Sequence, residues 1–138
     1  MTWDAVLFRA PQGVAIDDLP RDWRLPPIGT PEEVKVVFEE EFPGQRHVEG
    51  QSSVEGDTFW VLFNYNARND AGKIESIGVQ ASPTPAAIAV LRHACEVLGV
   101  RMMDCQTGEF ADFSQATVTS MDEYARWRER ALRKEESP

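Results

Sequence analysis

The stretch TFWVLFNYNARNDAGKIESIGVQA, residues 58–81, decides the fold that we expect for this chain. Over residues 58–66, large apolar side chains alternate between two faces, which is the pattern of a β-strand. One of these faces carries Phe59, Val61, Phe63 and Tyr65. Residues 67–73 supply asparagine, aspartate and glycine, which favour a turn, and residues 74–81 return as a second apolar segment. The stretch therefore predicts a β-hairpin.

Two amphipathic helices are predicted, one before this hairpin and one after it. Each opens on a Thr-Pro pair, at residues 30–31 and 84–85, in which the threonine caps the helix and the proline fits its first turn. Glu33 completes a capping box in the first helix. Glycines end both segments, Gly44 after the first helix and Gly99 after the second.

The order of the predicted elements indicates the fold class. Apolar segments at residues 6–8 and 101–106 predict two further strands, whereas the polar segment 45–57 is expected to be a loop or a weak edge strand. This order predicts an α+β fold, a ferredoxin-like β-α-β-β-α-β antiparallel sheet with two helices on one face, plus a C-terminal helix. We assign residues 1–119 to one domain and residues 120–138 to the C-terminal amphipathic helix and tail.

The connection between the first strand and the first helix, residues 10–29, contains four prolines. Proline removes a backbone donor and fixes φ, so a regular helix is excluded here. The connection also carries several apolar side chains, Trp23 among them. We therefore expect it to run extended and to pack against the body of the protein.

Composition excludes several classes of function. The 138 residues carry a formal net charge of −9, which makes nucleic acid an unfavourable partner. No apolar run reaches the roughly 20 residues that span a bilayer, and the N-terminus lacks the pattern of a signal peptide, so we expect no membrane association and a cytoplasmic location. The two cysteines, Cys95 and Cys105, lie in apolar patterns and are predicted to be core thiols. With two histidines and no paired ligand spacing, neither a metal nor another cofactor is expected.

Acidic residues supply the leading hypothesis for function. Three glutamates fall at the C-terminal turn of the first helix, where negative charge opposes the helix dipole, and further carboxylates follow in the next segment. A surface that keeps such charge suits a basic protein partner. The predicted binding residues are Glu39, Glu40, Glu41, Glu49, Glu55 and Asp57. The chain is thus predicted to be a non-enzymatic protein-binding module, and in size and charge it resembles immunity proteins that neutralise toxins.

The segment RMMDCQTGEF, residues 101–110, supports an alternative. Asp104 and Glu109 would form an acid/base pair beside Cys105 if the chain reversed at Gly108, which would give a small enzyme or ligand binder with a pocket there. The competing interpretation makes Cys105 a core residue and Asp104 a turn-capping group. A third hypothesis is a structural homodimer formed through the sheet or the C-terminal helix.

Several motifs resemble a group of small uncharacterised bacterial proteins. They include a Trp-Asp start, a Leu-Pro connection, the Gly-Thr-x-Glu-Glu-Val helix opening and the closing Asp-Cys-x-Thr-Gly-Glu-Phe, within residues 2–113. The resemblance implies a bacterial cytosolic origin. It implies no activity, so no site residues are transferred from it.

Overall fold

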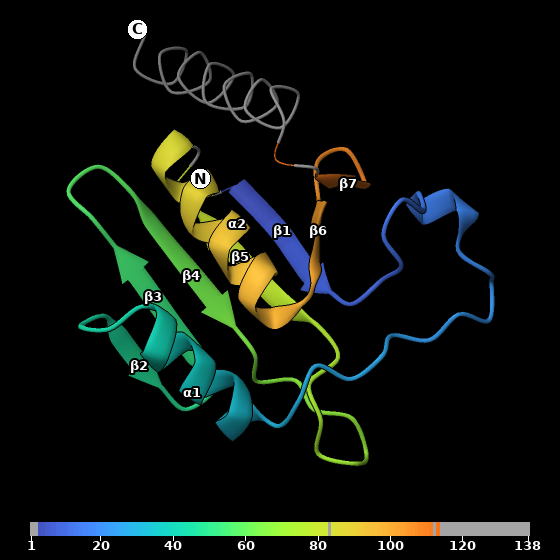
Figure 1. Cartoon of the computed structure of the whole chain (residues 1–138), viewed down its shortest axis with the longest axis horizontal. Coiled ribbons are helices and arrows are strands. Elements are labelled where there is room, and N and C mark those ends of the chain that lie inside the picture. The colour runs from blue at the N-terminus through green and yellow to red at the C-terminus, as the bar shows by residue number, and fades with distance from the viewer. Residues whose placement is uncertain (1–2, 83, 112, 114–138) are drawn as a thin grey trace, which may run out of the picture.

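A single antiparallel sheet of seven strands forms the frame of the protein in the computed structural model, which describes residues 3–82, 84–111 and 113. The strands lie in the order β2-β3-β4-β5-β1-β6-β7 (Figure 1). Their bounds are Trp3–Phe8 (β1), Arg46–Val48 (β2), Gln51–Glu55 (β3), Trp60–Asn64 (β4), Ile77–Ala81 (β5), Arg101–Asp104 (β6) and Glu109–Ala111 (β7). The helices are η1 (Ile16–Asp18), α1 (Pro31–Glu41) and α2 (Pro85–Leu98). The predicted C-terminal helix, residues 120–138, lies outside the described residues.

The ferredoxin-like β-α-β-β-α-β fold predicted from the sequence is wrong. The sheet contains seven antiparallel strands where that order supplies four, and the described part of the chain is mostly β with two α-helices. β7 is an unpredicted strand, and β2 and β3 lie in the segment 45–57, for which the prediction is a loop or a weak edge strand. β2 and β7 have three residues each and form the two edges of the sheet, and β3 is largely polar, so none of them shows the apolar alternation by which a strand is recognised.

The predicted helix starts are confirmed. The Thr30 hydroxyl accepts a hydrogen bond from the Glu33 amide at 3.1 Å, and the Glu33 carboxylate accepts one from the Thr30 amide at 3.2 Å. At α2 the Thr84 hydroxyl accepts from the Ala87 amide, and the helix ends at Gly99 in the left-handed conformation. None of the helices in this described part of the chain is long and apolar enough to cross a bilayer.

The core lies between the sheet and the two helices, which contact each other and stand in front of the sheet in the view of Figure 1. Its aromatic centre joins α1 to β4 and the residue that follows it. Phe38 stacks on Tyr65, with ring centroids 5.5 Å apart, and packs against Phe63 at 4.6 Å. The largest fully buried side chains are Trp3, Tyr65, Phe38, Phe63, Leu7, Ile74, Ile77, Leu91, Met102, Val34 and Val61. Burial of such side chains supplies most of the driving force for folding.

The proline-containing connection, residues 10–29, is fastened to the body as predicted. Trp23 contacts Phe8 of β1, with ring centroids 6.2 Å apart. Two arginines of the body, Arg9 and Arg101, donate side-chain hydrogen bonds to backbone carbonyls of the connection. Hydrogen bonds from these two cationic side chains therefore help to hold the connection in position.

Candidate functional site

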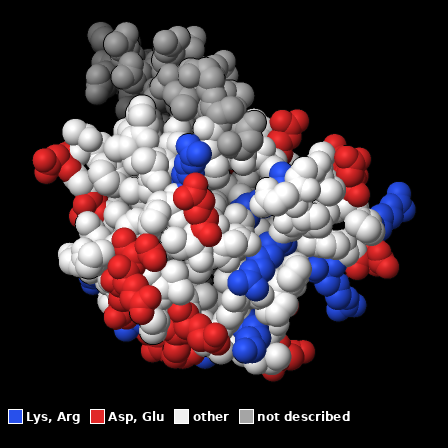
Figure 2. Space-filling view, in the orientation of Figure 1, with Lys and Arg blue, Asp and Glu red and all other residues white. Residues whose placement is uncertain are grey.

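Carboxylates dominate the part of the surface formed by α1 and the β2–β3 hairpin. Residues 31–57 contain eight Asp or Glu and two Lys or Arg, and all eight carboxylate residues are exposed. Figure 2 shows acidic side chains gathered over α1 and along the adjacent side of the molecule. We use the name acidic surface for the six predicted binding residues within this region, Glu39, Glu40, Glu41, Glu49, Glu55 and Asp57.

The structure places these six residues around the β2–β3 hairpin rather than in one tight cluster. Glu39, Glu40 and Glu41 form the end of α1, whose last turn contains no basic residue. The Gln45 amide group then exchanges two hydrogen bonds with the backbone of Glu55, which ties the segment after α1 to the end of β3. Asp57 follows in the turn after β3, whereas Glu49 lies at the opposite end of the hairpin.

Half of the acidic surface contacts side chains of the same chain. Lys35 lies 3.6 Å from Glu39, and Arg68 lies 3.4 Å from Glu49. The Nε2 atom of His93 in α2 lies 2.8 Å from a carboxylate oxygen of Glu41. Exposed ion pairs contribute about 0–1 kcal/mol each to stability, so an external cation can displace them at little cost.

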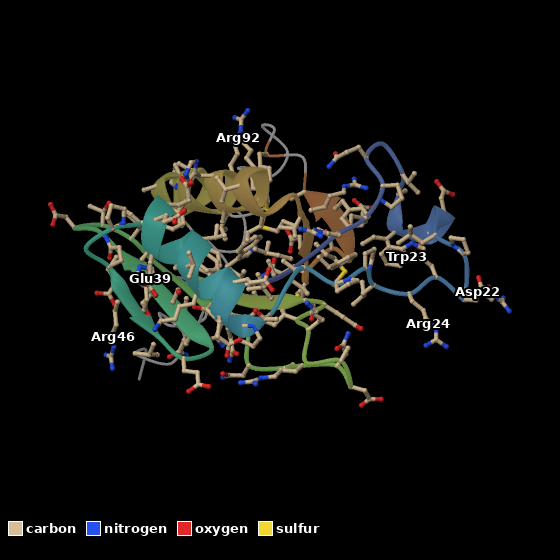
Figure 3. All side chains as sticks on the ribbon, turned by 60° about the horizontal axis from the view of Figure 1, so that its bottom comes forward. Asp22, Trp23, Arg24, Glu39, Arg46 and Arg92 are labelled. Carbon is tan, nitrogen blue, oxygen red and sulfur yellow. The ribbon has the colours of Figure 1, made fainter. Side chains whose placement is uncertain are left out.

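The other half, Glu40, Glu55 and Asp57, makes no ion pair within residues 3–82, 84–111 and 113. The nearby cation Arg46 forms no ion pair with any of them, and its side chain extends from β2 on the side away from α1 and Glu40 (Figure 3). Three exposed carboxylates thus remain available to an external cation.

A buried polar chain supports the sheet beneath this surface. His47 lies 3.0 Å through Nε2 from the Phe42 carbonyl oxygen and 2.8 Å through Nδ1 from the Ser52 hydroxyl. The Ser52 hydroxyl in turn lies 2.7 Å from the Tyr65 hydroxyl. Burial raises the pKa of Tyr65, and the charge of Glu39 acts in the same direction, although the hydrogen bond from Ser52 opposes the shift. Ser52 is fully buried, so this serine–histidine contact is closed to substrate and fixes the hairpin instead.

Sequence reasoning missed this chain because its members come from three different segments. His47 belongs to the polar segment 45–57, which is predicted to be a loop or a weak edge strand, and it lies on β2 directly opposite Ser52 of β3. Only the register of the strands shows that His47, Ser52 and Tyr65 meet, and no spacing along the sequence signals it.

Residues 104–109 form the hairpin that the alternative site requires. The chain reverses at Gly108, and Asp104 of β6 pairs in register with Glu109 of β7. Asp104 is buried, and its carboxylate accepts a hydrogen bond from the Gln106 amide at 2.8 Å. Asp104 therefore has the turn-capping role of the competing interpretation, while Glu109 is exposed.

Cys105 is neither a core residue nor an activated thiol. The thiol was predicted to belong to the core, but Cys105 is exposed in the turn after β6, so that prediction is wrong. Partial burial raises the pKa of the thiol, and the negative charges of Asp4 and Asp104 raise it further. A thiol with a raised pKa is a poor nucleophile at neutral pH. The hairpin consequently places a thiol that is not activated beside one buried and one exposed carboxylate.

Two depressions lie on either side of Arg101, a residue that sequence reasoning did not select. The larger, of about 540 Å³, is lined by Gln12, Gly13, Arg92, Cys95, Glu96, Gly99, Val100, Arg101, Ala111 and Phe113. The smaller, of about 370 Å³, is lined by Gly13, Val14, Ala15, Ile16, Asp17, Arg101, Gly108, Glu109 and Phe110. Glu109 thus lines the smaller depression, whereas Asp104 and Cys105 line neither of these two.

The ionisable groups of the larger depression do not form a reactive set. Arg92 and Glu96 lie 3.4 Å apart and neutralise each other. Cys95 is buried as predicted, and this burial raises the pKa of its thiol to about 12. Among the described residues, moreover, there is no group of three or more His, Cys, Asp or Glu side chains that could hold a metal ion. Nothing in this depression supplies an activated nucleophile.

No family model, no curated protein and no solved structure matches this chain. The resemblance to small bacterial proteins therefore stays a prediction from the sequence motifs.

Proposed function

We propose that this protein is a non-enzymatic, immunity-like binding module that uses its acidic surface to hold a basic protein partner. The observation that carries this proposal is the excess of exposed carboxylates over cations in residues 31–57, together with the lack of an ion pair at Glu40, Glu55 and Asp57 among the described residues. Complementary charge of this kind speeds association and selects the partner.

The chemistry of the other candidate regions favours binding over catalysis. The thiols of Cys95 and Cys105 both have raised pKa values, and Ser52 is closed to solvent. Asp104 is occupied in capping its own turn. A cytoplasmic location is part of the proposal, and the two free cysteines support it because reducing compartments disfavour disulfides.

The test compares two triple variants with the same change in charge. Glu40→Lys/Glu55→Lys/Asp57→Lys alters the acidic surface, and Asp17→Lys/Asp18→Lys/Asp22→Lys alters exposed carboxylates of the 10–29 connection. Each purified variant is used to capture partners from a bacterial lysate at low and high salt. Any captured protein is identified by mass, purified, and measured again by calorimetry.

We expect the wild type and the connection variant to bind the same basic protein in a salt-sensitive manner. The acidic-surface variant should bind it at least about tenfold more weakly, because opposed charges lower the association rate. Thermal unfolding of both variants confirms that they are folded. Equal binding by both triple variants, or a partner without excess positive charge, would contradict the proposal.

A further inference from the structure

We propose that the larger depression beside Arg101 is a binding site for a small organic carboxylate with an apolar body. The proposal is independent of the acidic surface, which lies at the other edge of the sheet. It follows from the way in which Arg101 is held, from the charges around the two depressions, and from the side chains that line the larger one.

Arg101 presents a guanidinium group that is fixed in position but only partly used. Its Nη1 atom donates hydrogen bonds to the carbonyl oxygens of Pro11, at 2.7 Å, and Val14, at 2.6 Å. Its central carbon lies 3.7 Å from the ring centroid of Phe110. The Nη2 and Nε donors have no hydrogen-bond partner within the described residues. A guanidinium carries five donors in a planar fork that matches a carboxylate, so a preorganised part of that fork remains open.

Charge directs an anion to the larger of the two depressions. The larger depression contains Arg92 and Arg101 against one carboxylate, that of Glu96. The smaller contains Arg101 against two carboxylates, those of Asp17 and Glu109. The local balance is therefore positive on one side of Arg101 and negative on the other. Figure 3 shows Arg92 extending from α2 towards solvent, and Arg92 is paired with Glu96, so we assign the contact with the anion to Arg101 alone.

The lining of the larger depression determines the rest of the ligand. Apart from the charged residues, it offers the polar Gln12 together with apolar and small residues, among them Val100, Ala111 and Phe113. Its volume of about 540 Å³ falls within the range of about 300–1,000 Å³ that small-molecule sites occupy. An anchoring arginine next to apolar walls fits a carboxylate on a compact apolar or aromatic body better than it fits a bare oxyanion.

The experiment uses the full chain and three small probes in an NMR titration. Phenylacetate represents the proposed class, phenylacetamide removes only the charge, and inorganic phosphate removes the apolar body. We expect phenylacetate to shift the amide signals of Gln12, Val100 and Arg101 with a Kd on the order of 1 mM, as for a ligand of about ten heavy atoms. Phenylacetamide and phosphate should bind at least about tenfold more weakly, because each keeps only one of the two interactions.

Three variants connect binding to the depression. Arg101→Gln removes the donor fork, and Ala111→Leu narrows the depression without changing Arg101. Arg24→Gln is the control, because Arg24 is exposed and makes no hydrogen bond or ion pair among the described residues. The first two variants should weaken phenylacetate binding at least about tenfold, and the control should stay within about twofold. If Arg101→Gln does not fold, Ala111→Leu carries the test.

Each of the remaining outcomes would overturn the proposal. One is that phenylacetate shifts no amide signal at about 20 mM, far above the expected Kd. Another is that it shifts signals outside the depression, or shifts them equally in Ala111→Leu and the wild type. A third is that phosphate produces the same shifts at the same concentration, which would make the site one for simple oxyanions.

Discussion

The two edges of the sheet use charge in opposite ways. Around β2, exposed carboxylates point into solvent and several have no cation beside them among the described residues. Towards β7, arginines give their hydrogen bonds to the backbone of the 10–29 connection. The net charge of −9 therefore does not describe a uniform surface: cations on one side are used in the structure, and anions on the other side are available for a partner.

The largest expected effect on the free energy of unfolding comes from removing an arginine on one side, and the comparison is the removal of a glutamate on the other. Arg101→Gln loses two charge-assisted hydrogen bonds and the contact with Phe110, so we expect the free energy of unfolding to fall by about 3 kcal/mol. Glu40→Gln removes an exposed charge and should stay within about 0.5 kcal/mol of the wild type. Denaturant unfolding measures both values, and similar losses in the two variants would remove the distinction.

A second test concerns the backbone at the acidic edge. Gly44 and Gly50 both have a φ of +78°, but they differ in what an added Cβ would meet. At Gly44 there is open space, whereas at Gly50 the Cβ would lie 1.6 Å from the side-chain oxygen of Asn66. We expect Gly44→Ala to cost about 1 kcal/mol from the left-handed backbone alone, and Gly50→Ala about 2 kcal/mol.

The difference between these two glycine variants isolates the displacement of Asn66. Both are measured by denaturant unfolding under the same conditions. If Gly50→Ala is no worse than Gly44→Ala, then Asn66 turns away freely and the β2–β3 turn is less tightly specified than its contacts indicate.

Features that depend on neighbouring residues could be predicted from the sequence, and features that depend on distant segments could not. The predicted helices were found because their signals are local: Thr30 and Glu33 stand three residues apart, and Gly99 directly follows the last turn of α2. β7 was missed, and β2 and β3 could be predicted only as a loop or a weak edge strand, because nothing local marks them. Ser52 is a polar residue in a buried position, where it is stable through its contacts with His47 and Tyr65 on other segments, so an apolar pattern could not reveal β3.

The candidate sites show the same limit. The acidic residues could be selected from the sequence, since charge is visible there, but their distribution around a hairpin could not. Arg101 was not selected, because its significance depends on carbonyls about 90 residues away along the chain. Cys105 was placed in the core because its neighbours are apolar, yet the turn after β6 carries it to the surface.

A third test addresses the buried polar chain beneath the acidic surface. Ser52→Ala leaves the Tyr65 hydroxyl and one nitrogen of His47 without their partner, so we expect a loss of about 1.5 kcal/mol. Ser53→Ala is the matched control on the same strand, because Ser53 is only half-buried and makes no side-chain hydrogen bond among the described residues. It should change the free energy of unfolding by less than about 0.5 kcal/mol. Equal effects would show that β3 needs no buried hydroxyl.

The smallest effect is expected at Glu33, the carboxylate that caps α1. Hydrogen bonds from Thr30 hold the pKa of Glu33 below its ordinary value of 4.5, with a further contribution from Lys73. The lowered pKa means that the ionised Glu33 stabilises the folded state above about pH 4.5, and that this stabilisation disappears as the pH falls through the lowered value.

Glu33→Gln separates the charge from the hydrogen bond, because glutamine can still accept from the Thr30 amide. Its unfolding free energy should therefore be slightly lower than that of the wild type at pH 7, with the two values converging below pH 4.5. Glu32→Gln, at the neighbouring exposed position, should retain the acid-range loss of the wild type, because it leaves Glu33 unchanged. If Glu33→Gln instead follows the wild-type curve, the capping carboxylate acts through its hydrogen bond alone. The charge of Glu33 would then have no structural role of its own, and the contrast with the arginines near β7 would be sharper.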